Sequence, residues 1–223
     1  MENRQKKILQ LVVESFVKSA EPVGSRFLAE KSSLGVKEAT IRNELRAMEE
    51  DGYLTHPHTS AGRIPTQDGY IYYVENIMSP GGINEKIKNK IKKELRENKD
   101  LNLKSLGKIV ADISNLAVII AFGRDDIYYT GLSNLFSQVE FREYGEVIRF
   151  SQIFDQVDAE IDNVFDLFGE HSSILVGNNN PFGADCSLVG RKIKNILFTI
   201  MGPIRMDYSK NAALLDYISE LSQ

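Results

Sequence analysis

Residues 37–66 read KEATIRNELRAMEEDGYLTHPHTSAGRIPT, and this stretch decides the fold of the N-terminal third of the chain. Apolar Ile41, Leu45 and Met48 recur at helical spacing, which predicts an amphipathic helix over residues 37–50. Gly52 is placed to end that helix, because glycine readily adopts the left-handed conformation of a helix C-cap. Residues 53–54 and 64–65 then predict two short strands that flank a polar loop.

Two more helices are predicted before this stretch and one after it. Apolar residues recur at helical spacing over residues 4–19, and Ser25 is a favourable N-cap for a short second helix. A fourth helix is predicted over residues 67–78. Helix, helix, turn, helix and hairpin is the order of a winged helix-turn-helix, so we assign residues 1–78 to such a domain.

The remainder of the chain predicts a linker and a second domain. Ser79-Pro80-Gly81-Gly82 is a cluster of helix-breaking residues, and we interpret residues 79–108 as a linker with a lysine-rich connecting helix over 84–98. Residues 109–223 mix both element types, which predicts an α+β fold rather than a doubly wound parallel sheet. The predicted strands cover 116–122, 127–130, 145–150, 172–177, 186–189 and 196–201, and the predicted helices cover 153–168 and 209–221.

Charge is distributed unevenly along the 223 residues, whose formal net charge is −4. Residues 1–78 carry 10 Lys/Arg against 11 Asp/Glu, residues 81–108 carry 9 against 4, and residues 109–223 carry 8 against 16. The acidity therefore lies mostly in the C-terminal half, which we expect to face away from nucleic-acid phosphates. We interpret the lysines of residues 84–98 as a solvated helix face rather than as a second DNA site.

The helix over residues 37–50 carries the side chains that could read DNA. The second helix of a helix-turn-helix enters the major groove, where arginine can make paired hydrogen bonds to guanine and asparagine to adenine. An exposed polar face without any partner would explain the same residues equally well. The predicted readers are Lys37, Thr40, Arg42, Asn43 and Arg46, and Arg26 on the preceding helix is a predicted phosphate contact.

The loop HPHTSAGRIPT is a candidate wing that strengthens the DNA interpretation. We expect Gly62 and Arg63 at its tip, with the guanidinium group beside the duplex. His56 and His58 could indicate a metal site, but the chain has one distant cysteine, so we interpret them as polar wing residues and expect no metal. The predicted DNA contacts of the wing are His58, Thr59, Ser60, Gly62 and Arg63.

Several other classes of protein are excluded by the sequence. It contains no P-loop, no GxSxG elbow and no HExxH motif, so we expect neither enzymatic activity nor a cofactor. No apolar run reaches the length of a membrane span, so no membrane association is expected. The single cysteine, Cys186, cannot form an internal disulfide and suits a reducing cytoplasm.

The motifs of both ends resemble one family, the bacterial heat-inducible transcription repressor HrcA. At the N-terminal end these motifs are EPVGSR, ATIRNEL, MEEDGYL and above all HTSAGRIPT followed by GY, all within residues 21–70. At the other end they are DCSLV and GPIRMDY followed by LLDYISEL, within residues 185–221. The resemblance is strong over about residues 3–78, clear over 185–223 and weak between them.

The resemblance implies a function, a second fold and partners. Members of the family repress chaperone operons by binding an inverted-repeat operator, the CIRCE element, as dimers. Their C-terminal part is similar to a GAF fold with a dimerisation insert, and the chaperonin GroEL helps to keep them active. This chain is shorter than typical members between about residues 158 and 185, so the insert is expected to be shortened or absent.

A second interpretation of the chain belongs to a different functional class. In it, the C-terminal domain senses a ligand or a protein, and the winged helix binds protein or RNA instead of DNA. A homodimer with two reading helices matches a palindromic operator, which favours the repressor.

Overall fold

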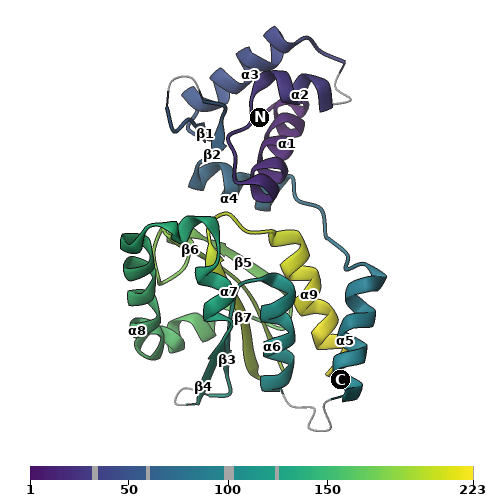
Figure 1. Cartoon of the computed structure of the whole chain (residues 1–223), viewed down its shortest axis with the longest axis vertical. Coiled ribbons are helices and arrows are strands. Elements are labelled where there is room, and N and C mark those ends of the chain that lie inside the picture. Colours follow the sequence, from purple (N-terminus) through teal and green to yellow (C-terminus); the bar gives the residue numbers. More distant parts are fainter. Residues whose placement is uncertain (32–34, 59–60, 98–102, 124–125, 223) are drawn as a thin grey trace. The chain divides into compact units, whose positions relative to one another are not determined.

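The structure is a computed structural model that describes residues 1–31, 35–58, 61–97, 103–123 and 126–222 (Figure 1). The chain divides into two compact units, Met1–Ser79 and Pro80–Gln223. Each unit buries its own set of apolar side chains and so has its own core.

Unit 1 contains four helices and one small hairpin within its described residues. Its helices and strands are α1 (Asn3–Ser19), α2 (Ser25–Lys31), α3 (Glu38–Glu50), β1 (Leu54–Thr55), β2 (Ile64–Pro65) and α4 (Gln67–Asn76). The strands β1 and β2 pair antiparallel, with Leu54 opposite Pro65. This order agrees with the order of elements that residues 4–78 predict.

The core of unit 1 forms around α1. That helix buries Ile8, Leu9, Val12 and Val13 and contacts α2, α3, α4 and β2. Thr66 then starts α4 as an N-cap, because its hydroxyl accepts a hydrogen bond from the backbone N–H of Gly69 at 3.1 Å. The contacts of α1 thus hold α3 and the hairpin in one packed unit.

Unit 2 consists of a five-stranded sheet with helices on both faces. Its helices are α5 (Glu85–Glu97), α6 (Leu103–Ser114), α7 (Leu132–Phe136), α8 (Tyr144–Leu167) and α9 (Tyr208–Leu221), with short 3-10 turns at Val139–Arg142 and Gly177–Asn179. The strands β3 (Ala117–Ala121), β4 (Ile127–Thr130), β5 (Ser173–Val176), β6 (Cys186–Ile193) and β7 (Ile196–Pro203) pair antiparallel in the order β4-β3-β7-β6-β5.

Neighbouring tyrosines of β4 show which helix covers which face of the sheet. The Nζ of Lys104 on α6 lies over the ring of Tyr128, whereas the ring of Tyr129 contacts that of Phe154 on α8. Because successive side chains of a strand point to opposite faces, α6 and α8 lie on opposite sides. α9 contacts α6 and shares its face (Figure 1). Covered on both faces, all five residues of β3 are buried.

Two parts of unit 2 differ from the sequence predictions. The predicted strand over residues 145–150 is wrong, because these residues form the first turns of α8. Val147, Ile148 and Phe150 fit a helix as well as a strand, and the buried series that continues through Ile153 and Val157 makes the segment one helix. The predicted linker of residues 79–108 contains α5 and the first half of α6, whose residues 103–114 form one unbroken helix.

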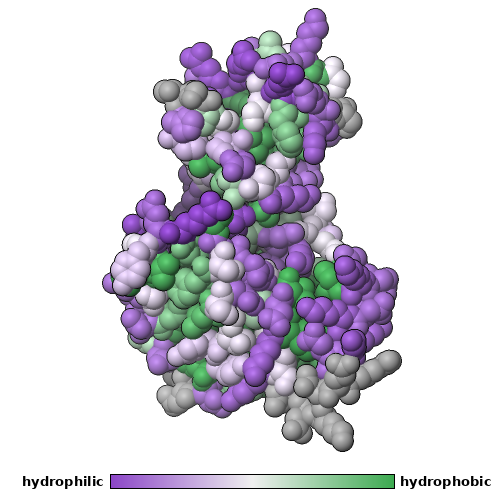
Figure 2. Space-filling model, viewed as in Figure 1, coloured by the Kyte–Doolittle hydropathy of each residue, from purple (hydrophilic) through white to green (hydrophobic). Residues whose placement is uncertain are grey.

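The lysine-rich helix α5 packs on unit 2 through one narrow side. Ile91 is fully buried, and the Nζ of Lys88 lies 5.8 Å from the centre of the Tyr217 ring on α9. Lys86, Lys90 and Lys93 are exposed, and the visible surface over α5 is hydrophilic (Figure 2).

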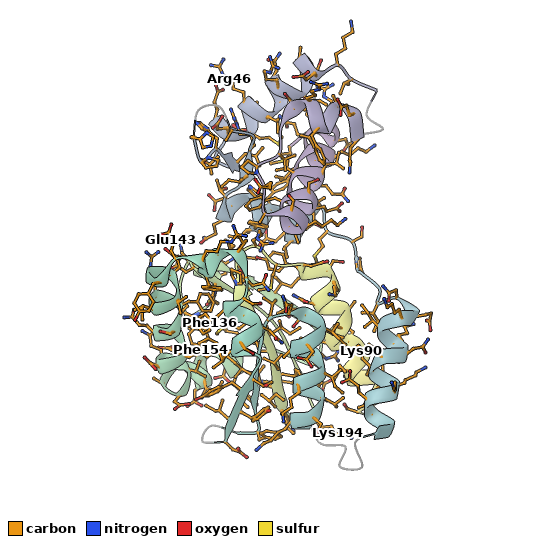
Figure 3. All side chains as sticks on the ribbon, in the orientation of Figure 1. Arg46, Lys90, Phe136, Glu143, Phe154 and Lys194 are labelled. Carbon is orange, nitrogen blue, oxygen red and sulfur yellow. The ribbon has the colours of Figure 1, made fainter. Side chains whose placement is uncertain are left out.

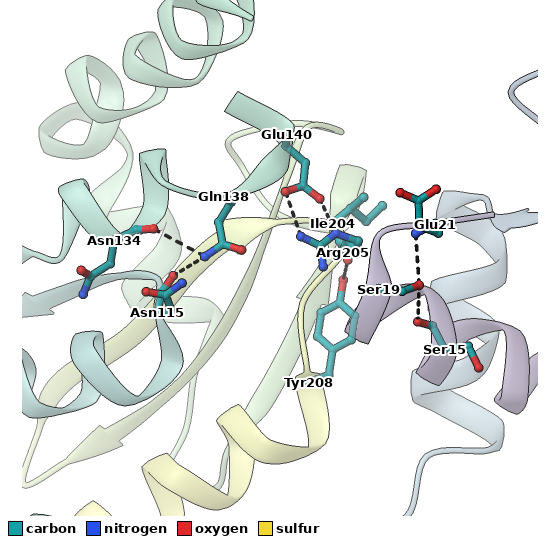
Figure 4. A network of polar contacts seen from close by, with 10 residues as sticks. All are labelled: Ser15, Ser19, Glu21, Asn115, Asn134, Gln138, Glu140, Ile204, Arg205 and Tyr208. Atoms are coloured by element: carbon teal, nitrogen blue, oxygen red, sulfur yellow. Dashed lines mark hydrogen bonds and ion pairs between the residues drawn. The ribbon is translucent and has the colours of Figure 1, made fainter. Parts of the chain in front are cut away.

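The motif GPIRMDY joins the end of β7 to α9. Arg205 forms a bidentate ion pair with Glu140 (Figure 4). Its Nε donates to Oε1, and its Nη2 donates to Oε2 at 3.0 Å. The hydroxyl of Tyr208 donates to the carbonyl of Ile204 at 2.5 Å, and the carboxylate of Asp207 caps α9. The motif therefore stabilises the connection between β7 and α9 in unit 2.

We expect Arg205→Ala to destabilise unit 2. The Arg205 side chain is 11% exposed and that of Glu140 is 28% exposed, so removal of the arginine leaves a partly covered carboxylate without its cation. The expected loss is about 1–3 kcal/mol of local unfolding free energy, measured by hydrogen exchange of the β7 amides. Arg149→Ala is the control, because the Arg149–Glu146 pair is exposed on α8 and such pairs contribute about 0–1 kcal/mol. Equal effects of both variants would contradict this assignment.

Candidate nucleic-acid interface

The helix α3 presents one apolar and one polar side. Ile41, Leu45 and Met48 are buried in unit 1, with Ile41 and Met48 fully inaccessible. These three contacts fix the rotation of the helix about its axis. Residues on its other side must therefore face solvent.

The predicted reading residues lie on that solvent side. Arg42, Asn43 and Arg46 are exposed, as is Lys37 at the N-cap, whereas Thr40 is half-buried. Figure 3 shows Arg46 on the outer side of α3. Long side chains with several donors are thus available along the first three turns of the helix.

Carboxylates accompany the arginines of this surface. On α3, Arg42 Nη2 lies 2.5 Å from Glu38 Oε1, and Arg46 Nε donates to Glu50 Oε1 at 2.9 Å. On α2, the exposed Arg26 pairs in the same way with Glu30 at 3.1 Å. All three pairs are spaced four residues apart, so each is made within one helix.

The glutamate at the start of α3 also connects the two helices of the helix-turn-helix. Ser25 Oγ on α2 donates to Glu38 Oε1 at 3.1 Å. A negative side chain in the first turn is also favoured by the helix dipole. Glu38 therefore orients Arg42 and holds α2 against α3.

The prediction that Gly62 and Arg63 form the tip of the wing is wrong. Arg63 lies at the base of the hairpin, where its N–H donates to Val23 O and its carbonyl accepts from Val23 N, both at 2.9 Å. The bridge brings the two backbones so close that a Cβ on Gly62 would lie 2.5 Å from the carbonyl carbon of Val23. Glycine is needed here for close approach and not for a turn at the tip.

The side chain of Arg63 turns toward α3 and is 23% exposed. Its Nη2 lies 2.7 Å from Glu49 Oε2, and the other carboxylate oxygen of Glu49 binds Nδ1 of His56. Partial burial opposes ionisation of Glu49, but the hydrogen bond to His56 and the charge of Arg63 outweigh it and lower the pKa of the carboxyl. His56 after β1 and Arg63 before β2 are thereby both bound to Glu49 of α3.

The remaining predicted wing contacts are less fully described. His58 is exposed, whereas Thr59 and Ser60 lie outside the described residues. Across the residues that the structure describes, no group of three or more His, Cys, Asp or Glu side chains is arranged to hold a metal ion. Within the same residues, no helix has the length and hydrophobicity that a bilayer span requires.

The buried cysteine belongs to unit 2. Cys186 on β6 is fully inaccessible, and burial raises the pKa of its thiol to about 12. Its sulfur remains protonated at neutral pH and is a poor nucleophile.

The sequence analysis did not predict that glutamates lie beside the arginines of this surface. The spacing of Glu38 with Arg42 and of Arg46 with Glu50 could have predicted those pairs. No local signal joins Arg63 to Glu49 or to Val23, because the hairpin must first fold before these residues meet.

Comparison with known proteins places the chain in a family. Residues 79–211 match the sequence profile of the HrcA protein C-terminal domain, which covers more than half of the chain. The chain belongs to the HrcA family. The profile also covers residues 79–184, where the motifs of this chain resemble the family only weakly.

Curated HrcA proteins are similar to large parts of the chain. The chain is 42% identical over 125 residues to the heat-inducible transcription repressor HrcA of Symbiobacterium thermophilum, an alignment over 54% of the chain and 36% of that relative. With the protein of the same name from Chlorobium phaeobacteroides it is 32% identical over 191 residues, 78% of the chain and 54% of the relative. The chain thus spans between about a third and about half of these HrcA relatives.

A solved structure shares the fold. The crystal structure of a hypothetical protein superposes with a TM-score of 0.74 at 18% identity, covering 100% of this chain and 96% of that one. The predicted fold class is confirmed: an α+β chain with an N-terminal winged helix-turn-helix followed by the GAF-like domain of the HrcA family.

Proposed function

We propose that the protein is a sequence-specific repressor of heat-shock (chaperone) genes that binds an inverted-repeat operator of the CIRCE type. One observation carries the proposal: in a chain of the HrcA family, α3 of a winged helix directs Arg42, Asn43 and Arg46 to solvent. The relatives that it matches are heat-inducible transcription repressors by name.

In this proposal, α3 enters the major groove. Arginine pairs with O6 and N7 of guanine and asparagine with N6 and N7 of adenine, so Arg42, Asn43 and Arg46 supply direct readout of bases. Lys37 and Thr40 lie near the N-terminal end of the helix, which comes closest to the base edges. Arg26 on α2 contacts a phosphate and fixes the register of the domain without reading sequence.

The wing supplies the second group of contacts. We assign the phosphate or minor-groove contacts to His58, Thr59 and Ser60, which the sequence places between the two strands. Gly62 and Arg63 act from the base, where they hold the hairpin against the α1–α2 turn and against Glu49.

An inverted repeat requires two reading heads, so we propose that the protein acts as a homodimer through unit 2. A single winged helix buries less surface than tight and specific DNA binding needs, and twofold symmetry of the protein matches twofold symmetry of the operator. Involvement of the chaperonin GroEL stays a prediction from the family resemblance.

Selection from random duplexes tests this function. The immobilised full-length protein is mixed with duplexes that contain a randomised segment, and the retained sequences are read after several rounds. We expect an inverted repeat to emerge, because a symmetric dimer presents α3 twice. Recovery of no common sequence would contradict the proposal. In a parallel selection that also contains a randomised single-stranded RNA, retention of the RNA in preference to the duplexes would favour an RNA-binding module.

A further inference from the structure

The predicted reading surface contains as many carboxylates as arginines. Each of four arginines lies within 3.1 Å of a glutamate of the same unit. The pairs are Arg26–Glu30, Arg42–Glu38, Arg46–Glu50 and Arg63–Glu49. A surface that binds DNA by charge alone would leave its cations without such neighbours.

Two of the four glutamates make contacts outside their own helix. Glu38 on α3 accepts the hydrogen bond of Ser25 on α2, and Glu49 pairs with Arg63 of the wing. Glu30 and Glu50 each pair with the arginine four residues earlier, and of these two it is Glu50, the last residue of α3, that lies on the predicted reading helix. A negative charge at that end of a helix is unfavourable toward the helix dipole.

The hydrogen bond of Glu50 has a geometry that matters for Arg46. It is made by Nε of the guanidinium group, so it restrains the side chain while leaving both terminal amino groups for another partner. Those two groups can bind O6 and N7 of guanine together. Both side chains are well exposed, at 76% and 64%, so solvent reaches the pair from the side that DNA would occupy.

We propose that Glu50 is a specificity-determining residue that positions Arg46 and repels the phosphates of non-cognate DNA. Non-specific binding depends almost wholly on phosphate contacts, which a carboxylate four residues away weakens. Specific binding also gains from base hydrogen bonds, and these benefit from an arginine that is already oriented. Discrimination between sites can rest on such a repulsive element as much as on attraction. This inference rests on the proposed function.

The test separates the two effects of Glu50 with two variants of the full-length protein. Glu50→Gln removes the charge but retains an oxygen that can accept from Arg46 Nε, whereas Glu50→Ala removes both. Glu75→Gln is the matched control, because Glu75 is exposed on α4 and its loss changes the net charge equally. Affinities are measured by fluorescence anisotropy on an inverted-repeat duplex and on a scrambled duplex of the same composition. Circular dichroism confirms that each variant is folded.

For Glu50→Gln we expect about threefold tighter binding to the scrambled duplex, because one phosphate-repelling charge is gone, and a smaller gain on the inverted repeat. For Glu50→Ala we expect the same gain on the scrambled duplex together with a loss of about threefold on the inverted repeat. Unequal effects on the two duplexes are therefore the signature of the proposal.

The outcomes that overturn the inference are distinct from one another. If the wild type prefers the inverted repeat but both Glu50 variants shift the two affinities by the factor found for Glu75→Gln, Glu50 has no role in specificity. If the wild type itself shows no preference for the inverted repeat, the proposed function fails, and this inference fails with it.

Discussion

The double variant Arg42→Ala, Asn43→Ala is expected to bind an inverted-repeat duplex no more tightly than a scrambled one. Both residues are exposed on α3, and neither is part of the core that Ile41, Leu45 and Met48 form. A bidentate contact to a base is worth about 1–3 kcal/mol, and a dimer loses two such contacts in each reading head, so the variant loses on the order of 1000-fold or more of discrimination. Anisotropy titrations on the two duplexes measure this ratio directly.

A matched control for that variant exists in unit 2. Arg149 and Asn163 are exposed on α8, and their replacement by alanine removes the same two side-chain types. We expect Arg149→Ala, Asn163→Ala to retain the preference of the wild type. Full operator preference in the Arg42→Ala, Asn43→Ala variant would show that α3 does not read the bases.

The second large effect is expected for Gly62→Ala. The new Cβ would lie 2.5 Å from the backbone of Val23, so the two hydrogen bonds between Val23 and Arg63 cannot both persist. The wing would then lose its fixed position, and affinity should fall about tenfold on the inverted repeat and the scrambled duplex alike, because wing contacts to the backbone carry no sequence information. Faster hydrogen exchange of the Val23 and Arg63 amides would accompany this loss.

Gly24→Ala is the control for the wing. Gly24 lies next to Val23 in the same turn, but a Cβ at that position has open space around it. We expect exchange and affinity close to those of the wild type. If Gly62→Ala behaves like Gly24→Ala, the bridge between the turn and the hairpin does not position the wing.

Local periodicity was sufficient to predict most of unit 1. The spacing of Ile41, Leu45 and Met48 determined both the extent of α3 and its solvent side, and Gly52, with φ of 83°, ends it as the sequence predicts. The candidate readers followed from the same spacing, because the residues between buried positions of a helix must face outward. Whether they contact bases stays a prediction.

Features that depend on distant partners could not be predicted in this way. The sequence predicts Arg63 at the tip of the hairpin, but the bridge to Val23, about forty residues earlier, places it at the base. Residues 145–150 were assigned to a strand because a short apolar run fits either element, and only the packing of α8 on the sheet distinguishes them. The ion pair of Glu49 with Arg63 likewise arises from the folded hairpin.

A titration of the wild-type protein decides whether the outward face of α3 reads an inverted repeat. The wild-type full-length protein is titrated, by fluorescence anisotropy, against an inverted-repeat duplex and a scrambled duplex over a series of salt concentrations. We predict that both affinities fall as salt rises, since phosphate contacts contribute to both, while a preference of at least about 1000-fold for the inverted repeat persists at every salt concentration. Equal affinities for the two duplexes at every salt concentration would contradict the account.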